Sequence, residues 1–584
     1  MSTPAYPAGV WCADFEFHPE HGQDGNPVVP ICLVVQEVHA GVIRRYWRDE
    51  LIGMSQAPFP TTAEALLVAY SASAEMACFA ALNWPFPANV LDLYAEFRNL
   101  TNGLMLPAGK GLLGALTYFG EPCMAATQKD VMRDLILSAG PWTADEREAI
   151  SAYCEADVVA LVRLYRRMAG GLIDWPRAVL RGRYAICAAV SESRGVPLDL
   201  DIYATLRAQS PRIRQQLIAE VDAAYGVYTQ GSFREARFAE YLARQVIAWP
   251  RLKSGRLQLD DDTFREMARV YPQLTPLRQL RQALVQLRDI KLTVGADGRN
   301  RFALFPFSSL TGRNQPSTSR SIFGLGSWLR GLIRPLPGHA LAYIDFSQQE
   351  LAIAAKLSGD EAMQHAYRSD DFYMSLAITA GFAPPGATKA SHPQVRERFK
   401  VCALGVLFGM TEEGLARRLG LSSLDARRLL DAHRQTFPAF WKWSDAVADH
   451  AMLTGSLRTV FGWTLHLDRQ PNVRSLRNFP MQANGAEMMR LAHAELVRQG
   501  IQVCTPVHDA FLIEAPLDEI ETVVERAQAI MRQASAIVLD GFEVRSEAQI
   551  VRYPQRFMEA KGVAMWNRVM LLLERCDWCV EVQA

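Results

Sequence analysis

Asp345 and Glu350 are the residues whose positions most clearly suggest chemistry. They belong to the stretch YIDFSQQE, which follows the β-prone residues ALA and places Asp345 at the end of an apolar run. Glu350 comes about one helical turn later. Because carboxylate oxygens are preferred ligands of Mg2+, a strand that ends in Asp345 can hold a divalent cation beside a sugar-phosphate.

A further carboxylate, Asp509, lies in a predicted β-hairpin. Apolar runs over Val503–Val507 and Phe511–Ile513 flank it, as expected for two strands joined by a short turn. That turn would expose His508 and Asp509. Alone, such a pair is usually a surface turn, but Asp345 and Asp509 together could bridge two magnesium ions.

Four side chains form one stripe on a predicted helix from Arg396 to Gly409. Arg396, Lys400, Leu404 and Phe408 recur every four residues, so they share one slowly drifting face. Two cations followed by an aromatic ring suit a triphosphate that lies along the helix with its base at the far end. Taken alone, the helix fits a solvated basic face better than a phosphate-binding one.

Asp14 and Glu16 stand two residues apart in the strand-like segment GVWCADFEFHPE. Alternation along a strand puts both carboxylates on the same face. Paired carboxylates repel each other and normally need a cation, so this segment predicts another metal site.

The elements that position these residues must come from several lobes. A chain of 584 residues is too long for one hydrophobic core and indicates three to five lobes, and 49% hydrophobic content is that of a globular protein. Lys+Arg and Asp+Glu both number 62. The bulk charge therefore lacks the basic signature of a simple nucleic-acid binder, although acids and cations can be segregated between sites.

Scattered cysteines in apolar contexts indicate reduced thiols and a cytoplasmic location. The N-terminal residues show no secretory signal, and no run of 18 apolar residues is present, so we expect no membrane contact. Residues 171–300 show mainly helical periodicity. Arg278, Arg281 and Arg288 in this region could grip duplex phosphates or could belong to a solvated amphipathic helix.

Three segments, in this order, resemble motifs A, B and C of family A DNA polymerases: Tyr343–Glu350, Arg396–Gly409 and Val507–Pro516. The match departs from the family pattern at Ala510, where motif C usually has Glu, and at Leu404, where relatives carry Phe or Tyr. A resemblance to this family extends over residues 171–570.

Shorter matches accompany the three motifs. Thr311-Gly312-Arg313 is similar to a T-G-R run upstream of motif A, and Gly455–Trp463 is similar to a G-x-x-x-T-x-F-G segment. Asn478 and Gln482 stand in an N-x-P-x-Q frame, with Arg474 four residues before Asn478.

The resemblance implies roles for these residues. Asp345, Asp509 and the backbone carbonyl of Phe346 would hold two Mg2+ ions, and Lys400 would donate the proton to departing pyrophosphate. The residues assigned to the incoming nucleotide are Arg396, Lys400, Leu404, Phe408, Glu350 and Gln348. Those assigned to DNA are Arg313, Arg474, Asn478, Gln482 and His508.

The N-terminal segment resembles DEDD-type 3′–5′ exonucleases with a catalytic tyrosine. Asp14 and Glu16 match the opening D-x-E, and Tyr153 and Asp157 match the closing Y-x3-D motif. Where the family has an Asp at a helix start, this chain offers Glu75, with Asp92 seventeen residues later. The resemblance implies two more Mg2+ ions, held by Asp14, Glu16, Glu75 and Asp157.

The fold expected is α/β and multidomain, with a ribonuclease H-like exonuclease domain followed by a right-hand polymerase. The expected boundaries are 1–170 for the exonuclease, 171–298 for the thumb and connecting helices, 299–350 for the first part of the palm, 351–450 for the fingers and 451–584 for the second part of the palm.

The function that the resemblance implies is template-directed DNA synthesis with 3′–5′ proofreading, by a replicative enzyme of a phage or mobile element. A monomer that binds primer-template DNA and deoxynucleoside triphosphates is expected, with room for processivity, helicase or primase partners. Two alternatives stay open. One is a 3′–5′ nuclease whose polymerase-like part only binds DNA; the other is a single-subunit RNA polymerase, against which Glu350 argues.

Overall fold

The computed structural model describes residues 9–22, 24–122, 126–172, 174–288, 290–468 and 472–581. The chain folds into two units that interrupt each other in sequence. Unit 1 comprises Met1–Gly195, Ala303–Gln315 and Ala340–Ile550; unit 2 comprises Val196–Phe302, Pro316–His339 and Val551–Ala584. The segment expected to form the second part of the palm, 451–584, therefore divides after Ile550 between the two units.

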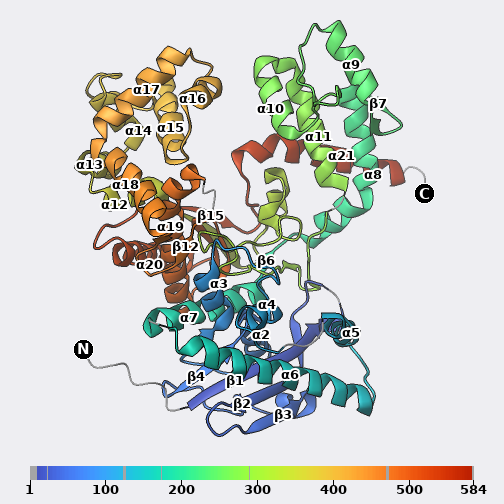
Figure 1. Ribbon diagram of the computed structural model, residues 1–584. Helices are drawn as coiled ribbons and strands as arrows, with labels where there is room; N and C mark the ends of the chain where they lie inside the picture. Colours follow the sequence, from blue (N-terminus) through green and yellow to red (C-terminus); the bar gives the residue numbers. More distant parts are fainter. Residues whose placement is uncertain are drawn as a thin grey trace. The chain divides into compact units, whose positions relative to one another are not determined.

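The N-terminal part of unit 1 is built on a five-stranded mixed sheet, drawn in blue in Figure 1. The strand order is β3-β2-β1-β4-β5, with antiparallel pairing from β1 to β3 and parallel pairing from β1 through β4 to β5. The strands are β1 (Gly9–Pro19), β2 (Val28–Glu37), β3 (Ile43–Trp47), β4 (Ala65–Ala69) and β5 (Val90–Asp92).

Helices cover both faces of this sheet. The long helix α6 (Ala144–Ala169) packs on the face that carries Cys12, while α2 (Ser73–Ala81) and α7 (Trp175–Arg194) pack on the face that carries Phe15. Asp14 and Glu16 have the same parity as Cys12, so they lie on the α6 side. The remaining helices here are α1 (Arg48–Ile52), α3 (Leu93–Thr101), α4 (Leu112–Tyr118) and α5 (Ala126–Leu137), with the short η1 (Glu20–Gly22).

A second sheet in unit 1 has the order β13-β14-β10-β15. Its strands are β10 (His339–Phe346), β13 (Gln502–Val507), β14 (Ala510–Pro516) and β15 (Ser546–Arg552). Buried residues of β10 pack with α12 (Gln349–Ser358), α19 (Val473–Arg498) and α20 (Ile520–Val538) in one hydrophobic core. The expected strand before Asp345 and the expected hairpin around Asp509 are both confirmed.

Six consecutive helices follow α12 and are drawn in yellow to orange in Figure 1. They are α13 (Glu361–Arg368), α14 (Phe372–Thr379), α15 (Pro393–Leu407), α16 (Glu412–Leu419), α17 (Ser423–Thr436) and α18 (Pro438–Thr454). Pro393 opens α15, where the missing N–H costs nothing. The helix predicted from Arg396 to Gly409 is thus confirmed within one turn, and a small hairpin of β11 (Ser456–Arg458) and β12 (Thr464–His466) leads into α19.

Unit 2 is mainly helical, as the periodicity of residues 171–300 predicted. Its helices are α8 (Leu200–Asp222), α9 (Glu235–Arg244), α10 (Asp261–Val270), α11 (Thr275–Arg288) and α21 (Ala560–Glu581), with the short helices η2 (Pro272–Leu274), η3 (Ile322–Gly324) and η4 (Ser327–Leu332). Its strands are two-residue pieces: β6 (Val196–Pro197), β7 (Tyr228–Thr229), β8 (Ser232–Phe233) and β9 (Arg299–Asn300).

Two of the three arginines considered for duplex binding make internal contacts within unit 2. Arg281 lies 4.4 Å from the ring centroids of both Phe233 and Phe264, and Arg278 pairs with Asp261 at 3.1 Å. These contacts argue against a role of Arg278 and Arg281 in binding duplex phosphates, because both cations already have partners within unit 2.

Within the described ranges, no helix is both long and apolar enough to span a membrane. The seven cysteines whose side chains are described are buried and form no disulfide among the described residues. This agrees with the apolar contexts in which the sequence places them.

Candidate active sites

Asp345 and Asp509 meet at the edge where β10 ends. Asp345 is the penultimate residue of β10, and Asp509 lies in the two-residue turn between β13 and β14. The backbone N–H of Phe346 donates to the carbonyl of Asp509 at 3.0 Å, which joins the two segments. His508, beside Asp509, is exposed and has a left-handed φ of 54°. The sequence-predicted pair is therefore brought together.

The environment of Asp345 fits a divalent cation. Burial, followed by the negative charge of Asp509 and a hydrogen bond with it, raises the pKa of Asp345 to about 7. Its Oδ1 is buried and, among the residues that the structure describes, has no hydrogen-bond partner. Two adjoining carboxylates and an unsatisfied oxygen are the arrangement that a bound metal ion would complete.

Glu350 lies in the first turn of α12 and is held from two directions. Its Oε1 accepts a hydrogen bond from Arg313 Nη2 at 3.4 Å, and it also bonds with Gln482. Burial raises the pKa of Glu350, against the attraction of Arg313. Gln348 caps the same helix in a left-handed conformation with φ 56°, and its buried Oε1 has no partner in the described ranges.

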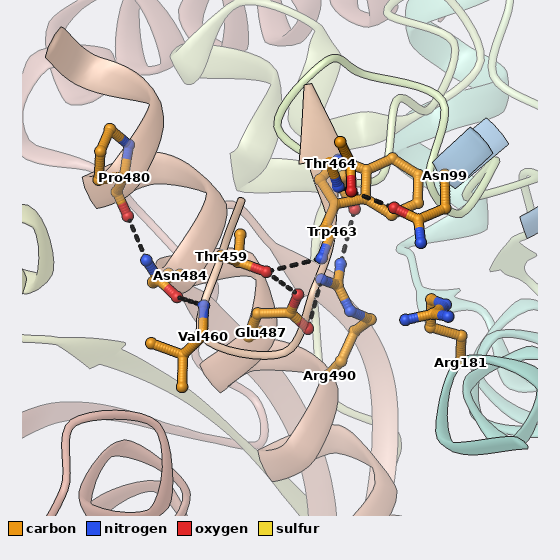
Figure 2. Close-up of polar contacts among 12 residues, drawn as sticks. Asn99, Arg181, Thr459, Val460, Trp463, Thr464, Pro480, Asn484, Glu487 and Arg490 are labelled. Carbon is orange, nitrogen blue, oxygen red and sulfur yellow. Dashed lines mark hydrogen bonds and ion pairs between the residues drawn. The ribbon is translucent and has the colours of Figure 1, made fainter. Parts of the chain in front are cut away.

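Glu487 and Arg490 form a buried ion pair (Figure 2). Arg490 also contacts the loop that carries Arg313. Arg490 Nη2 lies 2.7 Å from Glu487 Oε2, while Arg490 Nη1 donates to the carbonyl of Gly312 at 2.7 Å. Glu487 accepts in turn from Thr459 Oγ1 at 2.9 Å. Because a buried charge without a counter-charge is costly, the Glu487–Arg490 pair and the hydrogen bond to Gly312 help to hold the loop in place.

The same loop packs against Trp463. Gly312 has a φ of +73°, and a Cβ at this position would lie only 3.2 Å from the Trp463 ring. The indole Nε1–H of Trp463 donates to the carbonyl of Leu310 at 3.0 Å. The T-G-R run and the Gly455–Trp463 segment therefore pack against each other.

The N-terminal part of unit 1 also braces this region. Asn102, which follows α3, donates to the carbonyls of Leu310 and Thr464 at 2.7 and 2.8 Å. Asn99 Oδ1 accepts from the backbone N–H of Thr464 at 2.7 Å (Figure 2). The end of α3 is therefore connected by direct polar contacts to the loop around Leu310 and to β12.

The predicted stripe lies on α15, and its first residue already has a partner. Arg396 pairs with Asp371, which also caps α14, and its guanidinium lies 5.3 Å from the Tyr373 ring centroid. Lys400 is half-buried and, within the described part of the chain, forms no ion pair. It is thus the cation of the stripe that remains available to a phosphate.

The far end of the stripe is apolar. Leu404 is partly buried against the main core, while Phe408 caps α15 and is exposed. Gly409 follows with a φ of +63°, and a Cβ there would lie 2.8 Å from Arg474 Cγ. This contact brings Arg474, at the start of α19, beside the end of α15. Asn478, one turn further along α19, has a buried Oδ1 without a partner among described residues.

The N-terminal carboxylates form a separate acidic centre. Asp14 and Glu16 come from β1, and Glu75 comes from the first turn of α2. Burial and the neighbouring carboxylates raise the pKa of Asp14 to about 7 and that of Glu16 to about 10. Burial and Asp14 raise the pKa of Glu75 well above its ordinary value. The charges would be stabilised by a cation, so this donor set also fits a metal ion.

Tyr153 and Asp157 lie on α6 beside this centre. Asp157 acts electrostatically on Asp14 and Glu16 and is hydrogen-bonded with Tyr153, whose pKa is raised by burial and by Asp157. Cys154 Sγ donates to the carbonyl of Asp14 at 3.2 Å, and donor atoms of Asp14, Glu16 and Cys154 lie within 4.8 Å of one another.

Asp92 takes no open position in the acidic centre. Its carboxylate accepts from the backbone N–H groups of Ser71 and Tyr94, which makes it the N-cap of α3. Of the two acids that the sequence offered here, Glu75 is the one with an unsatisfied oxygen.

Three features of the two sites were not predicted from the sequence. Lys129 pairs with Asp157 at 3.0 Å. Glu547 on β15, beside β10, acts on Asp345 and accepts from Ser347 Oγ at 3.3 Å. The third is the buried Glu487–Arg490 pair. An i,i+3 acid–base pair within an apolar helix is the one local signal that could have indicated it.

Comparison with known proteins gives a consistent result. Residues 320–550 match the family model "DNA polymerase family A". The chain is similar to the thermostable DNA polymerase I of Thermus aquaticus, with 26% identity over 468 residues, which is 74% of this chain and 54% of the relative. It is also similar to DNA polymerase I of Aquifex aeolicus, with 25% identity over 64% of this chain and 67% of the relative.

Among solved structures, the fold is similar to that of the POL domain of Pol1 from M. smegmatis, a complex with DNA primer-template and dNTP. The TM-score is 0.70 at 18% identity, covering 93% of this chain and 95% of that chain. The α/β polymerase fold expected from the motifs is thereby confirmed. The chain spans about half the length of the Thermus aquaticus relative.

Proposed function

We propose, from the premise that residues 320–550 fall within DNA polymerase family A, that this chain is a template-directed DNA polymerase with a 3′–5′ exonuclease. It would add deoxynucleotides to a primer 3′-hydroxyl on primer-template DNA. The observation that carries this proposal is the meeting of Asp345 and Asp509, where one carboxyl has a raised pKa and an unsatisfied oxygen. A phage or mobile element as the source and a cytoplasmic location are parts of the same proposal.

In the synthesis reaction, Asp345, Asp509 and the carbonyl of Phe346 would hold two Mg2+ ions. When bound, such ions favour deprotonation of the primer 3′-hydroxyl and offset charge on the triphosphate. Lys400 would bind the phosphates and donate a proton as pyrophosphate leaves. Arg396 could bind the phosphates as well, in place of its present ion pair with Asp371.

The remaining residues would position the substrates. Arg313 and Gln482, which already meet at Glu350, would contact minor-groove acceptors common to correct base pairs. His508 would support the primer end. Gln348, Leu404 and Phe408 would contact the nucleotide, and Arg474 and Asn478 the template.

For the second activity, we propose that the acidic centre on β1, α2 and α6 removes nucleotides from a DNA 3′ end. Asp14, Glu16, Glu75 and Asp157 would hold Mg2+, and Tyr153 would position the attacking water. The pKa values of Asp14 and Glu16, raised by burial and crowding, support a centre that a cation stabilises.

Primer extension tests the main proposal directly. A primed template incubated with deoxynucleotides, and in parallel with ribonucleotides, should be extended only with the former. Extension with ribonucleotides would favour the RNA-polymerase alternative. Binding of the primed template without extension by either would favour a nuclease whose polymerase-like part only binds DNA.

Glu350→Ala is expected to weaken sugar selection. Removing the side chain opens space under C2′, where a 2′-hydroxyl would otherwise meet a carboxylate held by Arg313. Steric changes of this size are worth about 1–3 kcal/mol, so the preference for deoxynucleotides should fall by about tenfold or more. Single-nucleotide kinetics with dNTP and rNTP measure the ratio. The exposed Glu361→Ala serves as the control, and an unchanged ratio in Glu350→Ala would remove this residue from the sugar site.

Leu404→Tyr is expected to relax discrimination against dideoxynucleotides. Leu404 offers neither a flat ring nor a hydrogen-bond donor, so the wild type should reject them strongly. A Tyr hydroxyl could replace the hydrogen bond of the missing 3′-hydroxyl, worth about 1–3 kcal/mol. Competitive incorporation of dideoxy- and deoxythymidine triphosphate gives the ratio. Leu404→Phe is the control: it adds the ring without the hydroxyl and should keep most of the discrimination. If the wild type already accepts dideoxynucleotides as readily as the Tyr variant, Leu404 does not face the sugar.

A further inference from the structure

The acidic centre of the N-terminal sheet has more negative charge than its surroundings balance. Four carboxyl groups contribute: Asp14, Glu16, Glu75 and Asp157. Glu75 is only 3% exposed, its Oε2 has no hydrogen-bond partner in the described ranges, and the charge of Asp14 acts on it. Since buried carboxylates in such proximity cannot all ionise without a counter-charge, the centre needs cations.

One of those cations is supplied by the chain itself. Lys129, on α5, places its Nζ 3.0 Å from Asp157 Oδ2 and 5.9 Å from the centroid of the Tyr153 ring. Its side chain is 35% exposed, so the ammonium group is partly withdrawn from water. Burial raises the pKa values of Asp14 and Glu16, and the charge of Lys129 opposes this increase only weakly. The same ammonium therefore acts on both sides of the centre.

No other basic side chain performs this role within the described residues. Lys129 is the one Lys or Arg there that pairs with any of the four carboxylates. The positive charge is therefore unevenly distributed over the centre. Asp157 has an ammonium partner, whereas Glu75 Oε2 has no hydrogen-bond partner among the described residues. Among the described residues of the centre, the unsatisfied oxygen therefore belongs to Glu75 and not to the Lys129–Asp157 ion pair.

We propose that Lys129 takes the place of a second metal ion at Asp157, so that the exonuclease centre holds one divalent cation, bound by Asp14 and Glu16, whose carboxylate oxygens lie within 4.8 Å of each other. The inference rests on the proposed exonuclease function and narrows it, since the family resemblance implies two ions. An ammonium group offsets negative charge and donates hydrogen bonds to phosphate oxygens. It does not coordinate water, so metal-assisted activation of water falls to the single divalent ion.

Counting bound Mn2+ on the full-length chain tests this proposal without relying on activity. Free Mn2+ is measured by electron paramagnetic resonance at a series of total concentrations. The number bound by an Asp14→Asn/Glu16→Gln variant is subtracted, which cancels ions at the polymerase site and elsewhere. The measurement is made with and without deoxythymidine monophosphate, whose phosphate resembles the reaction product.

For wild type, the difference should be one Mn2+ per chain under both conditions. Lys129→Met should raise it to two, because Asp157 loses its cationic partner, and Lys129→Gln should do the same if the Met variant folds poorly. Lys129→Arg keeps the charge and should stay at one. Arg133→Met, an exposed cation on the same helix, is the matched control and should also stay at one.

Two outcomes would overturn the proposal in distinguishable ways. Two Mn2+ ions in wild type, or one in both neutral Lys129 variants, would remove Lys129 from the metal count while leaving the exonuclease proposal intact. A difference of zero in every variant, together with no 3′ degradation by wild type, would remove the exonuclease function and the Lys129 inference with it.

Discussion

Replacing Asp345 or Asp509 with asparagine should lower primer extension by at least about 10²-fold, with folding and DNA binding retained. The substitution keeps the shape of the side chain but removes a charged ligand from the place where β10 and the β13–β14 turn meet. A 10²-fold loss corresponds to about 2.7 kcal/mol in the activation barrier. Steady-state extension of a labelled primer, with DNA affinity measured separately, gives both quantities.

Asp540→Asn is a suitable control for this experiment. Its side chain is 99% exposed and makes only a surface ion pair with Lys356 at 3.4 Å, so extension should match wild type. Near wild-type extension by Asp345→Asn or Asp509→Asn would mean that these carboxylates do not hold the ions for synthesis. The assignment of the palm would then be wrong.

The double substitution Asp14→Ala/Glu16→Ala should abolish degradation of single-stranded DNA from its 3′ end and leave extension intact. Both carboxylates lie on the α6 side of β1, away from Asp345 in sequence and in a different sheet. A loss of at least about 10²-fold is expected for removal of two metal ligands. Release of labelled nucleotides from the 3′ end, with and without Mg2+, measures it.

Asp49→Ala/Glu64→Ala removes the same number of charges from exposed positions near this sheet and should leave degradation unchanged. A wild-type protein without magnesium-dependent degradation would indicate that the N-terminal domain is retained only for packing. The contacts of Asn99 and Asn102 with the region around Thr464 offer a reason for such retention. In that case, truncating the domain should still impair extension.

The sequence was sufficient to predict the elements that carry the candidate site residues, because the motifs are short. Asp345 and Glu350 are five residues apart, and Arg396, Lys400 and Leu404 follow one helical period. Local patterns were sufficient to predict the strand before Asp345, the hairpin at Asp509 and the helix of the basic stripe. The structure contains all three elements. The metal ions and the roles of these residues remain predictions.

The sequence could not specify which partners these residues meet. Arg396 pairs with Asp371 across 25 residues, and Arg490 binds the carbonyl of Gly312 across 178. Neither pair has a spacing that any helix or strand period would suggest. Unit 2 likewise brings Val551–Ala584 together with residues 196–302, which are far away in the sequence.

By itself, the sequence determined the local elements that carry the candidate ligands, since secondary structure and motif spacing are properties of neighbouring residues. Only the tertiary structure decided how the charges at each site are balanced. Lys129 reaches Asp157 from a different helix, and Glu547 reaches Asp345 from a neighbouring strand. The physical reason is that electrostatic interactions depend on distance in space and on burial, and both are set by the packing of segments far apart in the chain.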